Sequence, residues 1–312
     1  MSYSTKKQST TFMAYVREFV VLALIVFIIR TFGFGLYQVP TGSMEVTMLV
    51  GERFFADKLT YLFTKPKPGD VIAMNDPTFD YSDNKAQRLF QEYVWGPSNW
   101  TKRVIGVPGD KVRGTIEDGK PVIYVNDKKL DEPYVNKYPI IGVWKVDESH
   151  LRGMSEREIC ENWVWKSYDP SMPYDDPKQP FYRIIVNRII RGLDGNPIIL
   201  YPNTPVKNEH MDAQPLAGQR EQKAASGNHW DGSDEFYIEL GENQYWCMGD
   251  NRRGSKDCRV FGPIDRRLIH GRILLRLWSV DSDSAWWFMD LFQHPIDFWS
   301  RVRWSRFFER VR

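Results

Sequence analysis

The sequence predicts a mainly β protein, in which a partly closed, barrel-like core follows a single apolar helix near the N-terminus. Three observations support this fold class. An apolar run covers Phe19–Leu36. Beyond it, apolar segments of strand length alternate with turn signals. The 312 residues are 42% hydrophobic and 26% charged, the balance of a globular chain long enough to bury a core in one or two domains.

The apolar run predicts a membrane anchor. Phe19–Leu36 is interrupted only by Arg30 and Thr31, and as a helix at about 1.5 Å per residue it would nearly span a hydrocarbon core. Arg30 lies near one end, where a long side chain can reach the headgroups. Lys6 and Lys7 precede the run, so the positive-inside rule places the N-terminus in the cytoplasm. No small-residue cleavage site follows, which favours an uncleaved anchor over a signal peptide; a buried core helix is the other alternative.

The segments after the anchor carry β signals. Pro68–Ile72 and Pro108–Val112 each begin with Pro-Gly-Asp, a tight turn that leads into a strand. Val122–Asp127 is typical of a strand that enters a hairpin through Asn-Asp. Ile264–Leu277 predicts a further strand pair, with Gly271 at a bulge or close approach.

Changes in composition divide the chain into five parts. These are residues 1–36 (N-terminus and anchor), 37–141 (first part of the β core), 142–235 (an inserted, less regular second domain), 236–282 (second part of the core) and 283–312 (an aromatic and basic tail). The insertion is rich in Pro, Asp, Asn and Gln, with a short apolar run at Tyr182–Ile190. The tail fits either contact with a membrane surface or packing on the core, where Val302 and Trp304 would alternate with arginines as in a half-buried strand.

Composition also excludes several functions. The net charge of +2 gives no reason to expect nucleic-acid binding. Cys160, Cys247 and Cys258 are too few for a disulfide scaffold and too scattered for a metal site, although a Cys247–Cys258 pair stays open. The five histidines form no close metal-ligand spacing. We therefore expect neither a metal nor another cofactor.

Three segments carry possible chemistry. The first is Pro40-Thr41-Gly42-Ser43-Met44, directly after the anchor; the second is Thr101–Asp110, which begins Thr-Lys-Arg; the third is the polar loop Gly249–Arg259. Each alone would be an ordinary turn or a solvated surface. Together, and in this order, they resemble the P-S-G-S-M, K-R-x-x-G-x-P-G-D and G-D-N-R-x-x-S-x-D-S-R boxes of the bacterial type I signal peptidase (leader peptidase) family. Lys67–Ile72 is similar to the R-G-D-V strand of that family.

The resemblance implies a serine protease with a Ser/Lys dyad. Ser43 would be the nucleophile and Lys102 the general base, since a serine hydroxyl needs a base and no Ser-His-Asp pattern is evident. A lysine can serve if burial or nearby positive charge lowers its pKa. Ser255 matches the serine that hydrogen-bonds and orients the lysine. Thr41 stands where the family commonly has serine, and its hydroxyl would build the oxyanion hole with the Ser43 N–H.

The remaining site residues support the loop or the substrate. Asp250 and Asn251 are expected to shape their own turn through local backbone bonds. Asp257 and Arg259 match a charged pair that holds the loop. The resemblance places an extended substrate peptide, bound by strand addition, between two strands, which contribute Tyr37, Val39, Trp100 and Thr101.

The function implied by the resemblance is the removal of N-terminal signal peptides from exported preproteins, through an acyl-enzyme, after small residues at A-x-A-like sites. We expect a monomer that spans the bacterial inner membrane once, binds the lipid bilayer and holds its catalytic part outside. Ser43 lies only seven residues beyond Leu36, close to the outer surface. A catalytically dead binding module would have lost Ser43, Lys102 or Ser255. A Ser-x-x-Lys enzyme would need lysine where Val46 stands, and a self-cleaving repressor would not use an anchor.

Overall fold

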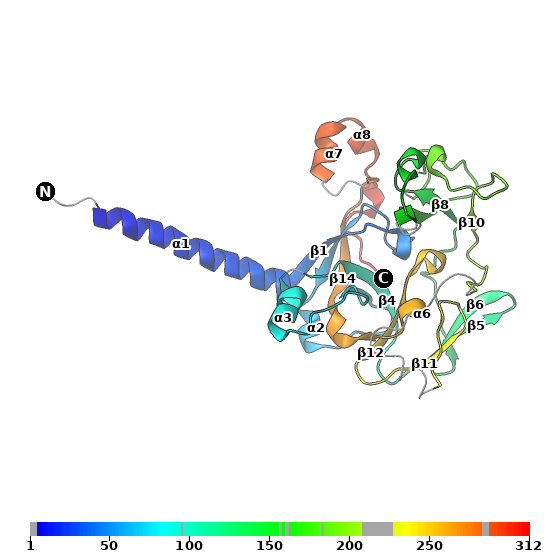
Figure 1. Ribbon diagram of the computed structural model, residues 1–312, viewed down its shortest axis with the longest axis horizontal. Helices are drawn as coiled ribbons and strands as arrows, with labels where there is room; N and C mark the ends of the chain where they lie inside the picture. The colour runs from blue at the N-terminus through cyan, green and yellow to red at the C-terminus, as the bar shows by residue number, and fades with distance from the viewer. Residues whose placement is uncertain are drawn as a thin grey trace.

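The computed structural model describes residues 5–94, 96–155, 158–159, 162–181, 184–207, 227–282 and 287–312. A long helix, α1 (Thr5–Ile28), continues into a π-helical turn, η1 (Ile29–Gly33), and projects from a body built mainly of strands (Figure 1). Within it Phe12–Gly33 is 22 residues long with a mean hydropathy of 2.4, and none of its apolar window is buried against the rest of the protein. The helix is therefore long and apolar enough to cross a membrane, and it is not a buried core helix.

The predicted bounds of the anchor were wrong at both ends. The helix begins well before Phe19 and ends at Gly33, so Phe34–Leu36 belong to strand β1 (Phe34–Gln38). This strand pairs antiparallel with β2 (Arg53–Asp57), with Phe34 opposite Asp57 and Gln38 opposite Arg53. A continuous apolar run does not distinguish a helix from a strand. Here the ladder with β2 decides the conformation of the last residues of the run.

The largest sheet has seven strands in the order β1-β2-β14-β3-β4-β12-β13. Besides β1 and β2 it contains β3 (Val71–Asn75), β4 (Asn99–Gly106), β12 (Gln244–Met248), β13 (Ile264–Asp265) and β14 (Ile269–Trp278). Strand β14 lies between β2 and β3, so a late segment of the chain completes the middle of a sheet that early segments begin. The sheet contains β4, which carries Lys102, and β1, which leads into the turn that carries Ser43.

A second sheet has the order β11-β5-β6-β7, from β11 (Phe236–Glu239), β5 (Lys111–Glu117), β6 (Lys120–Val125) and β7 (Lys128–Lys129). The hairpin predicted at Asn126-Asp127 is confirmed: both residues have positive φ, 51° and 63°, between β6 and β7. Both Pro-Gly-Asp turns also precede strands, with Gly69 and Gly109 at φ 87° and 89°. Such angles favour glycine. The mainly β prediction is confirmed.

The strand pair predicted at Ile264–Leu277 needs a correction. Its two strands, β13 and β14, are separated by a 3-10 turn, η6 (Arg266–Leu268), and they pair with different neighbours: β13 with β12, and β14 with β2 and β3. The ladder of β14 with β3 shifts register between Ile269 and Gly271, as expected for a bulge at this glycine.

A third sheet, β10-β8-β9, belongs to the segment expected as an insertion. It consists of β8 (Ile140–Trp144), β9 (Trp163–Ser167) and β10 (Ile199–Leu200), and β8 begins before the predicted boundary at residue 142. A separate small core lies against it, formed by Ile141, Val143, Tyr168, Ile184 and Ile189. Cys160 and Tyr182 lie outside the described residues.

Short helices and the tail complete the body. They are α2 (Thr60–Phe63), α3 (Lys85–Tyr93), α6 (Cys258–Phe261), α7 (Trp287–Gln293) and α8 (Asp297–Ser300), with 3-10 turns η2 (Gly42–Met44), η3 (Glu148–Leu151), η4 (Val186–Arg188), η5 (Arg252–Gly254) and η7 (Trp304–Arg306). The tail packs on the core through Phe298 and Val302, and Val302 bridges to Val280. The predicted strand ends there, because Trp304 begins a 3-10 turn. Trp286 lies outside the described residues.

Candidate active site

The predicted nucleophile sits in a short turn directly after β1. Ser43 is half-buried in the middle of η2, and the next side chain, Met44, is buried beneath it. From the opposite side, Asn251 donates its side-chain amide to the Gly42 carbonyl (2.9 Å) and its backbone N–H to the Ser43 carbonyl (3.1 Å). The nucleophile turn is thus held between the core and the third sequence box.

Lys102 comes to Ser43 from β4, near the middle of the large sheet. The Lys102 side chain is buried, with Nζ 3.1 Å from Ser43 Oγ and 3.1 Å from the Thr101 carbonyl oxygen. Burial lowers the pKa of the lysine, while Asp257, Cys258 and other acidic neighbours act in the opposite direction. Desolvation, rather than nearby positive charge, therefore favours the neutral amine that a general base requires.

Ser255 is close to this pair but does not make the predicted bond. Its hydroxyl is buried and has no hydrogen-bond partner among the described residues, while Lys102 donates to Ser43 and Thr101 instead. The first and third segments approach closely at Gly249, where a Cβ would clash with Ser255 Oγ and with the Ser43 carbonyl oxygen. Glycine is required there because backbone and side chains meet without space for another carbon.

Thr41 immediately precedes the nucleophile turn. Its backbone is extended (φ −135°, ψ 157°), its side chain is exposed and its hydroxyl makes no capping bond to the turn. The hydroxyl therefore has no competing role in the turn, as an oxyanion donor would require.

Asp250 and Asn251 do not shape their own turn by side-chain bonds, as was expected. Asp250 is fully buried and accepts two bonds from Arg103, from Nε at 2.8 Å and Nη2 at 2.7 Å, and a third from the Thr47 hydroxyl. Arg103 follows Lys102 on β4, so its side chain points to the other face of the sheet. The Asp250 carboxylate and the Asn251 amide thus bond to other segments, because the loop after β12 packs against β4 and the nucleophile turn.

The Asp257–Arg259 pair is present as the resemblance implied. Asp257 accepts from the Gly249 N–H (3.0 Å) and from Arg259 Nε (2.9 Å), and Arg259 also binds Asp234 at 2.7 Å. Burial opposes ionisation, yet Arg259 holds the pKa of the Asp257 carboxyl below its usual range. Cys247 of β12 and Cys258 of α6 are both free thiols, and the Cys247 N–H donates to Cys258 Sγ at 3.1 Å.

Two buried carboxyl groups in the loop after Ser43 were not predicted from the sequence. Glu45 is fully buried and accepts from the backbone N–H of Ser167 (3.1 Å) and from its hydroxyl (2.7 Å). Glu52 is also fully buried and accepts from Arg276 Nε (3.0 Å), Arg306 Nε (2.6 Å) and Ser279 Oγ (2.8 Å). Strand β9 and the tail thus both hold the loop that follows Ser43.

Of the four predicted substrate residues, three are half-buried and one is buried in the core. Trp100 and Thr101 are half-buried on β4, where the described ladder with β12 begins only at Arg103. Tyr37 is half-buried on β1. Val39 is not available, because its side chain packs in the core and both its backbone groups bond to Glu52 and Gly51. Strand addition therefore remains open beside Trp100 and Thr101.

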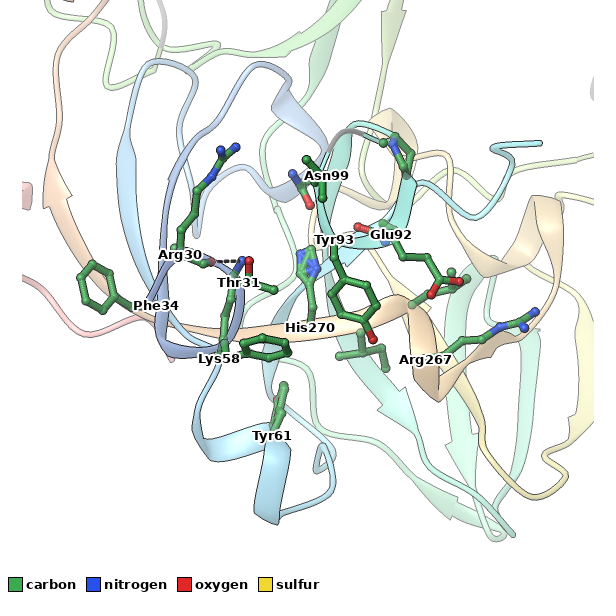
Figure 2. A pocket seen from close by; sticks show the side chains of 18 of the residues that line it. Arg30, Thr31, Phe34, Lys58, Tyr61, Glu92, Tyr93, Asn99, Arg267 and His270 are labelled. Carbon is green, nitrogen blue, oxygen red and sulfur yellow. Dashed lines mark hydrogen bonds between the residues drawn. The ribbon is translucent and has the colours of Figure 1, made fainter. Parts of the chain in front are cut away.

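A cavity of about 1060 Å³ lies beside Tyr37, between the end of the anchor, β1, α3 and the start of β14 (Figure 2). His270 stacks on the Tyr37 ring, and its Nε2 is 3.2 Å from the Tyr37 hydroxyl. Among the described residues, no group of three or more His, Cys, Asp or Glu side chains could hold a metal ion.

Comparisons with known proteins point to one family. The model of a family described as "Signal peptidase, peptidase S26" matches residues 12–165 and 178–278. The chain is 25% identical over 289 residues to "Signal peptidase I" of Buchnera aphidicola subsp. Acyrthosiphon pisum, covering 90% of this chain and 80% of the relative. It is 32% identical over 139 residues to "Probable signal peptidase I-2" of Synechocystis sp., covering 44% and 57%. A crystal structure of a signal peptidase I from Enterococcus faecalis V583 aligns over 67% of this chain and 97% of that chain, at 18% identity and a TM-score of 0.26, too low to support a structural argument.

Proposed function

This chain belongs to the signal peptidase family, peptidase S26, and is therefore a serine endopeptidase; we propose that it removes N-terminal signal peptides from exported preproteins with Ser43 and Lys102 as its catalytic dyad. One observation carries the dyad. Lys102 Nζ lies 3.1 Å from Ser43 Oγ while the lysine is buried. That distance allows direct proton transfer between the two groups.

In the proposed reaction, neutral Lys102 takes the proton of the Ser43 hydroxyl as Oγ attacks the carbonyl carbon of the scissile bond. The resulting oxyanion accepts hydrogen bonds from the Ser43 N–H and the Thr41 hydroxyl. The Lys102 ammonium then gives its proton to the leaving amine, and the C–N bond breaks. The signal peptide is left as an ester on Ser43.

Deacylation reverses these roles. Lys102 takes a proton from a water molecule as the water oxygen attacks the ester carbonyl, and then returns the proton to Ser43 Oγ as the ester bond breaks. Positioned acid–base catalysis of this kind contributes about 10²–10⁴-fold to the rate. Ser255, whose buried hydroxyl has no partner among the described residues, would orient the protonated lysine.

The location of the site supports the proposed substrate. The anchor ends at Gly33, and one short strand separates it from the nucleophile turn. A preprotein whose own apolar segment ends at the outer membrane surface would present its scissile bond at that level. We propose that the extended peptide lies along β4 beside Trp100 and Thr101, and that shallow contacts select small residues at −1 and −3.

The test is cleavage of a preprotein by the detergent-solubilised full chain, followed by sequencing of the new N-terminus. Ser43→Ala should abolish cleavage. Ser149→Ala, at an exposed serine of η3, is the matched control and should cleave at the wild-type rate. Near wild-type cleavage by purified Ser43→Ala protein would contradict the mechanism.

A further inference from the structure

The cavity beside Tyr37 lies where the anchor joins the body (Figure 2). Part of its wall comes from the anchor itself, at Val26, Ile29 and Arg30. The Lys58 N–H donates to the Gly33 carbonyl oxygen at 3.0 Å and so fixes the body against the end of the anchor. If the anchor spans a bilayer, this cavity lies where the hydrocarbon core gives way to the headgroups.

The lining of the cavity is basic. Four of its residues are cationic: Arg30, Lys58, Arg266 and Arg267. Lys58 Nζ donates to the Arg30 carbonyl oxygen (2.8 Å), and Arg266 donates to two carbonyl oxygens, contacts that leave their positive charges uncompensated. Arg267 has only a long, exposed ion pair with Asp265, at 3.7 Å.

The acidic and titratable groups of the cavity do not offset this charge. Glu92 also lines it, but that carboxylate is paired with Arg88 on α3 at 3.1 Å. Burial, followed by the charges of Lys58 and Arg266, lowers the pKa of His270 to about 3. Burial and the charge of Arg30 also lower the pKa of Lys58. The cavity thus has a positive potential, and its histidine is neutral at pH 7.

Apolar side chains also stand on the elements that border the cavity. Phe32 contacts Tyr93 of α3, with ring centroids 6.0 Å apart. Leu89 and Phe90 of the same helix are 56% and 52% exposed, and Phe63 at the end of α2 is 82% exposed. Exposed apolar groups around a basic cavity are the pattern expected at a bilayer interface, where chains and charged headgroups meet.

We propose that this cavity binds the phosphate-bearing headgroup of an anionic phospholipid, whose acyl chains lie along the anchor and α3. Guanidinium and ammonium groups are the donors that bind phosphate oxygens most strongly. A signal peptide would be a poorer occupant, because its apolar segment gains nothing from four cations. The proposal depends on the anchor spanning a bilayer, but not on the peptidase activity.

The test measures binding of water-soluble dihexanoyl phosphatidylglycerol, and of dihexanoyl phosphatidylcholine, to the full chain in a zwitterionic detergent. We expect the anionic lipid to bind at least about tenfold more tightly, and the difference to shrink as salt is added. Lys58→Gln and Arg267→Gln should each weaken its binding about fivefold, equivalent to about 1 kcal/mol per cation. Lys128→Gln, at an exposed lysine of β7 in another sheet, should leave it unchanged.

Further measurements distinguish the lipid from free anions, and the lipid-binding proposal from the peptidase proposal. Glycerol phosphate and inorganic phosphate should bind far more weakly than the lipid; equal affinity would indicate a free-anion site and overturn the lipid assignment. Ser43→Ala protein should bind the lipid like wild type, so a failed peptidase proposal would not affect this result. Equal affinity for the two lipids, unchanged binding by both cavity variants, or displacement of the lipid by a signal peptide would also overturn it.

Discussion

Ser167→Ala tests whether strand β9 positions the nucleophile. In the native protein, the Ser167 hydroxyl donates to Glu45 Oε2 at 2.7 Å, and the Asn136 amide donates to that hydroxyl at 2.7 Å. Glu45 lies two residues after Ser43, and its carboxyl packs against Gly42, where a Cβ would meet the carboxyl carbon at 2.9 Å. The substitution therefore removes a support directly behind the nucleophile turn.

The expected magnitude follows from these contacts. Burial raises the pKa of the Glu45 carboxyl and so favours its uncharged form. A hydrogen bond between uncharged groups contributes about 0.5–1.5 kcal/mol, and a buried donor left without an acceptor costs about 1–3 kcal/mol. Ser167→Ala does both, at Glu45 and at Asn136, while the Ser167 backbone N–H still donates to Glu45 at 3.1 Å. Because coupled contacts are not additive, we expect a loss of about 2–4 kcal/mol in the free energy of unfolding.

The same change should slow catalysis. A displacement of about 1 Å at a reacting group can cost about 10²-fold in rate. We therefore expect kcat on a peptide substrate in detergent to fall about 10–10²-fold. The proposed substrate peptide lies along β4 rather than β9, so KM should change little. Ser149→Ala again serves as the exposed control in the same segment.

A double-mutant cycle makes the claim sharper. If Ser167 acts through Glu45, then Glu45→Ala should cost less in the Ser167→Ala background than in wild type, with a coupling of about 0.5–3 kcal/mol in stability. Glu45→Gln keeps an oxygen acceptor for Ser167 and should retain most of the wild-type kcat. Additive costs, or an unchanged kcat in a Ser167→Ala protein that is clearly destabilised, would refute the positioning role.

Three further predictions concern the dyad, the oxyanion hole and the topology. Burial lowers the pKa of Lys102, and only the neutral amine can act as the base. We therefore expect kcat to rise with pH to an alkaline optimum, and Lys102→Arg to be inactive. A flat pH–rate profile from about pH 5 to 9, or an active arginine variant, would contradict this. Thr41→Ala and Thr41→Val should each lower kcat by about 10²–10³, and Thr41→Ser should stay within a few-fold; a Val variant nearly as active as wild type would show that only the shape of Thr41 matters. A reporter fused after residue 60 should be active outside the cytoplasm, because Lys6 and Lys7 precede the apolar helix; activity only inside would reverse the topology.

The features predicted correctly from sequence were those with a local physical cause. The Pro-Gly-Asp turns require a positive φ at their glycines, and Asn-Asp adopts the same region in the β6–β7 hairpin. Each of these turns therefore predicts the adjoining strand without information from the rest of the chain. The bounds of the anchor failed for a related reason. Hydrophobicity is local, but the switch from helix to strand after Gly33 depends on pairing with β2, which lies about twenty residues further on.

The Ser43–Lys102 pair and its surroundings show the limit of this reasoning. Their contact could be predicted because each residue stands in its own short box, so the resemblance names both members of the proposed dyad. Their supports have no such signature. Glu45 meets Ser167 across 122 positions, and Arg103 meets Asp250 across 147. A buried carboxyl must find a donor somewhere, but which donor depends on the topology that places β9 and the loop after β12 against the Ser43 turn. For that reason Asp250, judged locally, was assigned to its own turn, whereas in the structure it pairs with Arg103, on the strand that carries Lys102.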